Sequence, residues 1–139
     1  MALTSTPTQK SVNEHDLVTK AKAFIYHHYA EPISLALIAE TIGVSSSYLS
    51  NLFHKSVQES YIKFLTRVRM EQAAKLLKAR PAERIIDVSD KVGYVSVKHF
   101  SHVFKQHFHI PPGEYQEKTA IIHSDITVPI KPPATQSEG

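Results

Sequence analysis

The sequence contains no cysteine, which excludes disulfide bonds and cysteine-ligated zinc sites. The absence of cysteine is typical of a reducing compartment, so we expect a cytoplasmic protein. Only four residues are glycine, which leaves few for a phosphate-cradling loop. No apolar run approaches the roughly 20 residues needed to span a membrane, and no secretory signal is visible.

The usual motifs of enzyme sites are also missing. There is no nucleophile elbow, phosphate loop or HExxH motif, so we predict neither an enzyme nor a cofactor. Nine histidines keep a metal-binding protein or enzyme open as an alternative. His99 and His102 have a spacing loosely compatible with zinc, and His107 and His109 follow. However, His99 should point away from His102, and no carboxylate pair completes the set, so we predict no metal.

Positive charge is concentrated in the middle of the chain. The net charge is +3 and the sequence pI is near 9.1. Residues 1–52 carry a net charge of −1, residues 53–105 carry +6, and residues 106–139 carry −2. A basic segment of this kind favours a polyanionic partner such as nucleic acid, although a lysine-rich solvated surface would show the same excess.

Helical periodicity dominates residues 13–118, and no strand signal occurs there, so we predict an all-α domain. Residues 1–12 lack a core pattern and are interpreted as a linker or tag. Residues 119–139 are interpreted as a flexible tail. After a first helix that begins near Asn13 or Asp16 and ends before Pro32, helices are predicted over 35–42, 46–57, 60–79, 84–92 and 97–108, followed by a short turn around Tyr115.

The chain repeats itself. Gly43 and Gly93 stand fifty residues apart, and after this turn the offset becomes fifty-one, so the second turn holds one extra residue. Each copy is a short helix, a glycine-centred turn and a second helix, which is the helix-turn-helix pattern. The matching pairs after the turn include Ser45 with Ser96, Leu49 with Phe100, Phe53 with Phe104, and Phe64 with Tyr115.

The second helix of each copy has a polar outward face. Residues spaced i, i+3, i+4 and i+7 share one side of a helix. All eight outward side chains can hydrogen-bond to bases, and none is acidic. The predicted base contacts are Ser47, Ser50, Asn51 and His54 in the first copy, and Lys98, Ser101, His102 and Lys105 in the second.

The segments ISLALIAETIGVSSSYLSNLFHKSV, FLTRVRMEQAAKLL and VSDKVGYVSVKHFSHVFKQHFHIPPGEY resemble the DNA-binding domain of AraC/XylS transcription regulators. The resemblance covers residues 17–117, and its strongest part is the GY-x₅-FS-x-VFK run followed by PP-x-x-Y. It implies seven helices in two helix-turn-helix subdomains, 13–59 and 81–118, joined by a linker helix over 60–80. It also implies that the two recognition helices lie in successive major grooves of double-stranded DNA.

The sequence departs from the family at several positions. Gln58 and His109 follow the recognition helices where glycine is common, so these ends must close without the residue that best adopts a left-handed conformation. Gln116 replaces a common arginine, so we expect one phosphate contact to be missing. Ser96 replaces a capping aspartate, and Ser89 replaces alanine.

Structural roles are predicted for the turn residues Gly43 and Gly93 and for Arg69, the family's linker arginine by resemblance. Arg69 lies on the apolar face of the linker helix, where a cation needs a partner, and we expect Asp87 or, alternatively, Glu40 to supply it.

Lys75 is a further candidate for a contact to DNA phosphate. The predicted phosphate contacts are Ser45, Lys55, Lys63, Arg67 and Ser96.

The sequence therefore predicts a transcription regulator, or the DNA-binding part of one. We expect the full-length protein to carry a receiver module that this chain lacks; a small-molecule-sensing module and a stand-alone regulator are the alternatives. RNA polymerase is expected as a further partner. No membrane partner is expected. A protein-interaction helical domain, in which the groove-facing surface no longer binds DNA, remains a further alternative.

Overall fold

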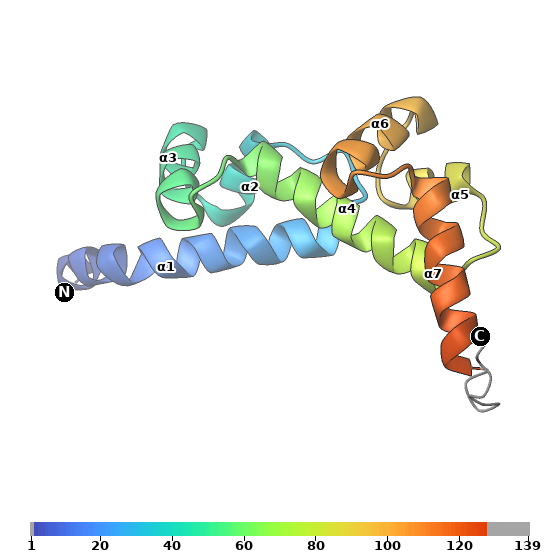
Figure 1. Cartoon of the computed structure of the whole chain (residues 1–139). Helices are drawn as coiled ribbons and strands as arrows, with labels where there is room; N and C mark the ends of the chain where they lie inside the picture. Colours follow the sequence, from blue (N-terminus) through green and yellow to red (C-terminus); the bar gives the residue numbers. More distant parts are fainter. Residues whose placement is uncertain (1, 128–139) are drawn as a thin grey trace. The chain divides into compact units, whose positions relative to one another are not determined.

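The computed structural model describes residues 2–127, with side chains for residues 14–120. These residues form seven helices and no strand (Figure 1), which confirms the predicted all-α class. Within them, no helix is long and apolar enough to cross a membrane. The helices are α1 Ala2–His28, α2 Leu35–Ile42, α3 Ser46–Val57, α4 Tyr61–Ala79, α5 Ile85–Lys91, α6 Val97–Phe108 and α7 Pro112–Thr127.

Serine hydroxyls mark the starts of four helices. The Oγ atoms of Ser34, Ser45, Ser60 and Ser96 each accept a hydrogen bond, at 3.1 Å, from the backbone N–H three residues further on. Each bond satisfies a donor that the first helical turn leaves unpaired. The starts of α2, α3 and α6 therefore agree with the sequence prediction.

The first helix is longer than predicted. The sequence pattern predicts a linker or tag over residues 1–12, but α1 begins at Ala2. A helical conformation does not decide whether these residues serve as a linker or tag, so that interpretation stays a prediction. Once a helix is nucleated, further residues can extend it without a second nucleation step.

The last helix is also longer than predicted. The sequence pattern predicts a short turn around Tyr115 and a flexible tail over 119–139, but α7 continues to Thr127. The rest of the predicted tail, 128–139, lies outside the described residues. Pro112 suits the first helical position because no N–H is needed there, and the weak helix preference of the β-branched residues after it did not end the helix.

The chain divides into two compact units, Met1–Arg69 and Met70–Gly139. In the first unit α1, α2 and α3 pack on one another, and in the second α6 packs on both α5 and α7. The boundary falls inside α4, so the predicted linker helix contributes its first half to one core and its second half to the other.

Each core contains an edge-to-face pair of aromatic rings at equivalent positions of the repeat. Phe53 meets Phe64 edge to face with ring centroids 5.3 Å apart, and Phe104 meets Tyr115 edge to face at 5.5 Å. Such edge-to-face pairs are favourable beyond the area they bury. The two pairs are related by the offset of fifty-one residues, so the repeat predicted from the sequence is a repeat of packing as well.

Candidate nucleic-acid interface

Helix α3 has one buried side and one exposed side. Leu49, Leu52 and Phe53 are buried. No acidic residue occurs anywhere in the helix, so nothing on it would repel a phosphate group. The predicted outward residues Ser47, Ser50, Asn51 and His54 are all exposed.

Helix α6 repeats this arrangement with a more basic surface. Phe100 and Phe104 are buried beneath it, and the helix again contains no acidic residue. Three of the four predicted contacts, Lys98, His102 and Lys105, are exposed, whereas Ser101 is only partly exposed. Ser101 therefore offers less surface to a base than its counterpart Ser50 in α3.

Glycine holds the turn between the two helices of each copy. Gly43 has φ +84° and Gly93 has φ +96°, in the left-handed region that glycine enters without a steric penalty. The N–H of Gly43 donates to the carbonyl of Ala39 at 2.9 Å, and that of Gly93 donates to the carbonyl of Asp90 at 3.1 Å. Both turns therefore need a residue that adopts positive φ, which explains why glycine occupies these two positions.

Two helix ends close through residues other than glycine. Gln58 follows α3 at φ 64°, and His109 follows α6 at φ 70°. Their N–H groups donate to the carbonyls of His54 at 2.9 Å and Lys105 at 2.7 Å. A side chain in this conformation costs about 1–2 kcal/mol, so each recognition helix ends with a strained residue.

The predicted phosphate contacts differ in how available they are. Lys63 is exposed and has no ion-pair partner within residues 14–120. Lys55 approaches Glu14 at 3.8 Å, a surface pair that contributes little and can open. Ser45 and Ser96 accept hydrogen bonds as caps, and each hydroxyl keeps a proton to donate.

Arg67 is already engaged by the protein. It pairs with Glu59, and its guanidinium lies 5.0 Å from the centre of the Phe64 ring. A phosphate would have to share Arg67 with this carboxylate. The structure therefore makes Arg67 a weaker phosphate candidate than Lys63.

Arg69 anchors the segment that follows α1. Its Nε donates to the carbonyl of Tyr29 at 2.7 Å, and its Nη2 donates to the carbonyl of Glu31 at 3.0 Å. Hydrogen bonds from a charged donor are stronger than neutral ones. These contacts give Arg69 a structural role within the first unit.

The prediction that Asp87 or Glu40 pairs with Arg69 was wrong. Asp87 accepts from Arg84, with Nε to Oδ2 at 3.1 Å, and Glu40 is exposed on α2. A carboxylate is the expected partner because a fully buried cation needs one. Arg69 is only partly buried, and the carbonyl dipoles of a nearby loop stabilise it, which the sequence pattern could not reveal.

Gln116 turns inward. Its Nε2 donates to the carbonyls of Arg80 at 3.1 Å and Glu83 at 2.8 Å. The amide thereby fastens the loop between α4 and α5 onto α7. The position that often carries arginine in the family serves packing of the second unit in this chain.

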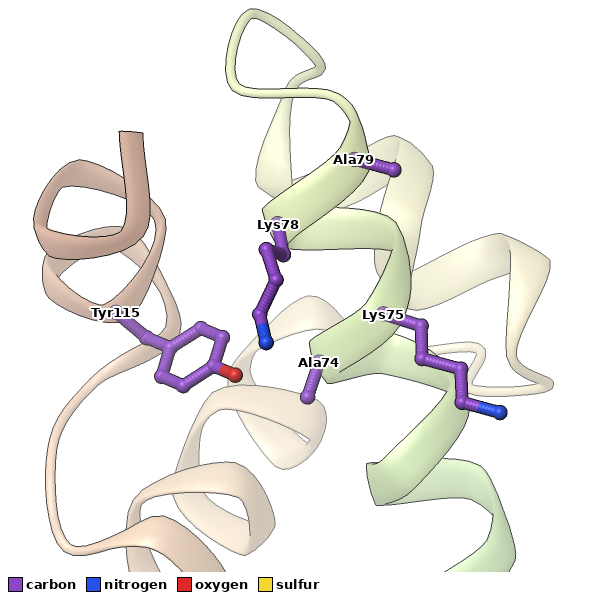
Figure 2. A pocket seen from close by; sticks show the side chains of 5 residues that line it. All are labelled: Ala74, Lys75, Lys78, Ala79 and Tyr115. Carbon is purple, nitrogen blue, oxygen red and sulfur yellow. The ribbon is translucent and has the colours of Figure 1, made fainter. Parts of the chain in front are cut away.

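A hollow of about 310 Å³ lies between α4 and α7 (Figure 2). Lys78 and the hydroxyl of Tyr115 turn toward each other across it, whereas Lys75 extends away from Tyr115. The ammonium group of Lys78 is therefore the one that points toward Tyr115. Its lining is Ala74, Lys75, Lys78, Ala79 and Tyr115.

A second, shallow hollow of about 430 Å³ lies on α6 and is lined by His102, Lys105, Gln106 and His109. All four side chains are exposed, and none has a hydrogen-bond or ion-pair partner within the described side chains. Gln106 and His109 were not predicted as contacts. Gln106 stands four residues after His102, so extending the helix face by one turn would have found it. His109 lies beyond the helix end in a left-handed conformation, so helical spacing does not predict its position.

The histidines whose side chains are described, within residues 14–120, do not assemble a metal site. The ring of His99 meets the ring of Tyr94 edge to face at 5.3 Å. Within residues 14–120, no group of three or more His, Cys, Asp or Glu side chains could hold a metal ion. The geometry therefore gives no support to the alternative of a histidine-bound metal.

The two copies, each presenting an exposed helix without acidic residues, define a double helix-turn-helix DNA-binding domain. Residues 38–118, more than half of the chain, match the family model described as Helix-turn-helix domain. The chain belongs to this family and is of the AraC type, as its motifs predicted. The family is one of DNA-binding transcription regulators, not of enzymes.

Curated relatives are longer than this chain. The lactose operon transcription activator of Staphylococcus xylosus is 34% identical over 110 residues, which cover 79% of this chain and 38% of the relative. The HTH-type transcriptional regulator GbdR of Pseudomonas aeruginosa is 32% identical over 100 residues, which cover 72% of this chain and 27% of the relative. The chain thus spans less than two fifths of either relative.

Solved structures share the fold. The C-terminal domain of the response regulator AraT from Geobacillus stearothermophilus is 32% identical with a TM-score of 0.70, and the match covers 73% of this chain and 84% of that one. An AraC-type transcriptional regulator from Chromobacterium violaceum is 28% identical with a TM-score of 0.71, covering 78% and 96%. The C-terminal domain of the two-component response regulator yesN from Fusobacterium nucleatum is 28% identical with a TM-score of 0.67, covering 75% and 98%.

Proposed function

We propose that the chain binds a specific double-stranded DNA sequence by inserting α3 and α6 into successive major grooves. The observation that carries this proposal is that both copies place a polar helix face without an acidic residue at the equivalent position. A major groove admits one α-helix. Two helices reading adjacent grooves on one side of the duplex would be centred about 34 Å apart.

The exposed side chains suit distinct tasks. Asn51 can pair with adenine through two hydrogen bonds, and Lys98 can reach guanine. Neither face carries arginine, so lysine is the guanine reader on offer. Lys63 and Lys55 would bind phosphates and displace counterions, which makes affinity fall steeply with salt.

Selection of binders from a random DNA pool tests the proposal. We expect the selected sequences to converge on two conserved blocks about one helical turn apart. Gel shifts against heparin then separate specific from purely electrostatic binding. Recovery of unrelated sequences that heparin displaces completely would refute sequence-specific reading and would favour a protein-interaction domain.

We further propose that the chain is the DNA-binding part of a larger regulator that acts on RNA polymerase in the bacterial cytoplasm. Support comes from the small share of the curated relatives that it spans. Two similar solved structures are C-terminal domains of response regulators, which favours a receiver module over a small-molecule sensor. An antibody against this chain should detect a cellular protein well above 15.6 kDa, and a band at that mass would refute the proposal.

A further inference from the structure

The end of α6 keeps a strained histidine. His109 lies at φ 70° and ψ 6° and closes the helix through its N–H. Glycine would adopt this conformation without a steric penalty. Residues held in sparsely populated conformations tend to cluster at functional sites, so the side chain of His109 is a candidate for a role that glycine could not fill.

That side chain lines a hollow in which every lining residue carries an N–H donor. His102, Lys105, Gln106 and His109 surround about 430 Å³ of open space. An imidazole has at least one N–H donor in either protonation state, and glutamine and lysine have N–H donors too. No acidic side chain lines the hollow. Four donors without partners around one space form a site suited to an anion.

Helix length supports a phosphate rather than a base as the occupant. A helix of 12 residues is about 18 Å long at 1.5 Å per residue. The major groove is only about 12 Å wide. If the first turns of α6 face base edges, its last turn reaches the wall of the groove, where the sugar-phosphate backbone runs.

We infer that the hollow formed by His102, Lys105, Gln106 and His109 holds one phosphate group of the DNA backbone. The inference rests on the proposed DNA binding, and it moves His102 and Lys105 from the predicted base contacts to a phosphate contact. The carboxyl end of a helix carries partial negative charge, and the ammonium group of Lys105 offsets it for the bound phosphate. His109 retains its strained backbone because its ring donates to that phosphate.

Two matched glycine variants test this site. His109→Gly and Gln58→Gly relieve the same kind of strain at equivalent helix ends, but Gln58 lines no hollow among those described. Both variants should melt about 2–5 °C above the parent chain. Loss of a hydrogen bond to a charged group should weaken DNA binding by H109G about tenfold, equally on target and random duplexes, while Q58G binds as the parent does.

A duplex with one phosphate replaced by a neutral methylphosphonate locates the contact. We expect one such position to weaken the parent chain and to leave H109G unaffected. Equal sensitivity of the two proteins at every position would overturn the inference, as would unchanged binding by H109G or a loss confined to the target sequence, which would indicate base reading.

Inorganic phosphate, titrated into the ¹⁵N-labelled chain, distinguishes a free anion from the DNA backbone as the occupant of the hollow. Chemical-shift changes at Lys105 and His109 together with unchanged duplex binding by H109G would assign the hollow to a free anion and overturn the DNA contact. Failure of the parent, Q58G and H109G alike to bind any duplex would refute the proposed function itself and, with it, this site.

Discussion

The guanidinium of Arg69 and the backbone carbonyl of Tyr29 are joined by a hydrogen bond of 2.7 Å, although forty residues separate them in the chain. Together with the bond from Nη2 to the carbonyl of Glu31, this contact holds the segment after α1 against α4. The helix-turn-helix of the first unit follows that segment directly. The position of α2 therefore depends on Arg69, although both of these hydrogen bonds go to the segment before α2 and neither goes to α2 or α3.

Replacing Arg69 with methionine should destabilise the chain by about 2 kcal/mol, because two carbonyls lose a charged donor. Urea unfolding followed by circular dichroism measures the change. Lys63→Met is the matched control, since Lys63 is exposed on the same helix, and it should change stability by less than about 0.5 kcal/mol. Equal effects of the two variants would show that the Arg69 hydrogen bonds do not stabilise the fold.

Replacing Gly43 with alanine should cost about 1 kcal/mol through the backbone alone. Gly43 has φ +84°, and an added Cβ would meet nothing within 4 Å, so no steric clash contributes. Gly113→Ala is the control, because Gly113 lies in the first turn of α7 and its Cβ would also meet nothing. Thermal melts should show a loss for G43A and no loss for G113A; a loss in both would point to a different cause.

Stability should fall above pH 10 because of Tyr61. Burial raises the pKa of Tyr61 above its usual value of 10.0, and the charge of Arg69 opposes this in part. The folded protein then holds the phenol proton more tightly than the unfolded chain does. The stabilisation is complete below pH 10 and is lost as pH rises through the folded-state pKa.

Urea unfolding between about pH 9 and 12 checks this dependence. Tyr61→Phe should flatten the decline, and it should lower stability at neutral pH by about 1 kcal/mol, since the hydroxyl donates to the carbonyl of Ile33 at 3.0 Å. Tyr48→Phe serves as the control because Tyr48 is exposed, and it should retain the decline. A decline of the same size in Y61F would contradict the assignment to Tyr61.

Replacing Asn51 with alanine should reduce the preference for target over random DNA by about tenfold, since a bidentate base pair contributes about 1–3 kcal/mol of discrimination. Competition gel shifts at fixed salt measure this ratio. Lys63→Ala should instead weaken binding to both duplexes equally and reduce the salt dependence. A uniform loss in N51A would remove Asn51 from the base contacts.

The parts of this fold that could be predicted from sequence are those that local chemistry decides. Ser34, Ser45 and Ser96 cap the next turn through their own side chains, and Gly43 and Gly93 adopt positive φ. These signals lie within a few residues of the boundary that they set. The starts of α2, α3 and α6 and the end of α2 agreed with the prediction for that reason.

The remaining features depend on contacts that sequence spacing does not encode. The donors of Arg69 and Gln116 bind backbone carbonyls, which every residue possesses and which leave no mark in the side-chain pattern. The extra turns of α1 and α7 are consistent with helix propagation, which a search for local start and stop signals does not capture. The hollow on α6 includes His109, which lies one residue beyond the helix and joins the site through its left-handed backbone.

The unlike outward faces of α3 and α6 have a consequence for gene organisation. One presents two serines, an asparagine and a histidine, and the other presents lysines, a serine and a histidine. A dimer with two-fold symmetry reads a palindrome identically from both ends, whereas the proposed binding by two dissimilar helices would give the site a direction. Under that proposal, inverting the site beside a promoter would reverse the bound protein, so the orientation of the site would affect regulation.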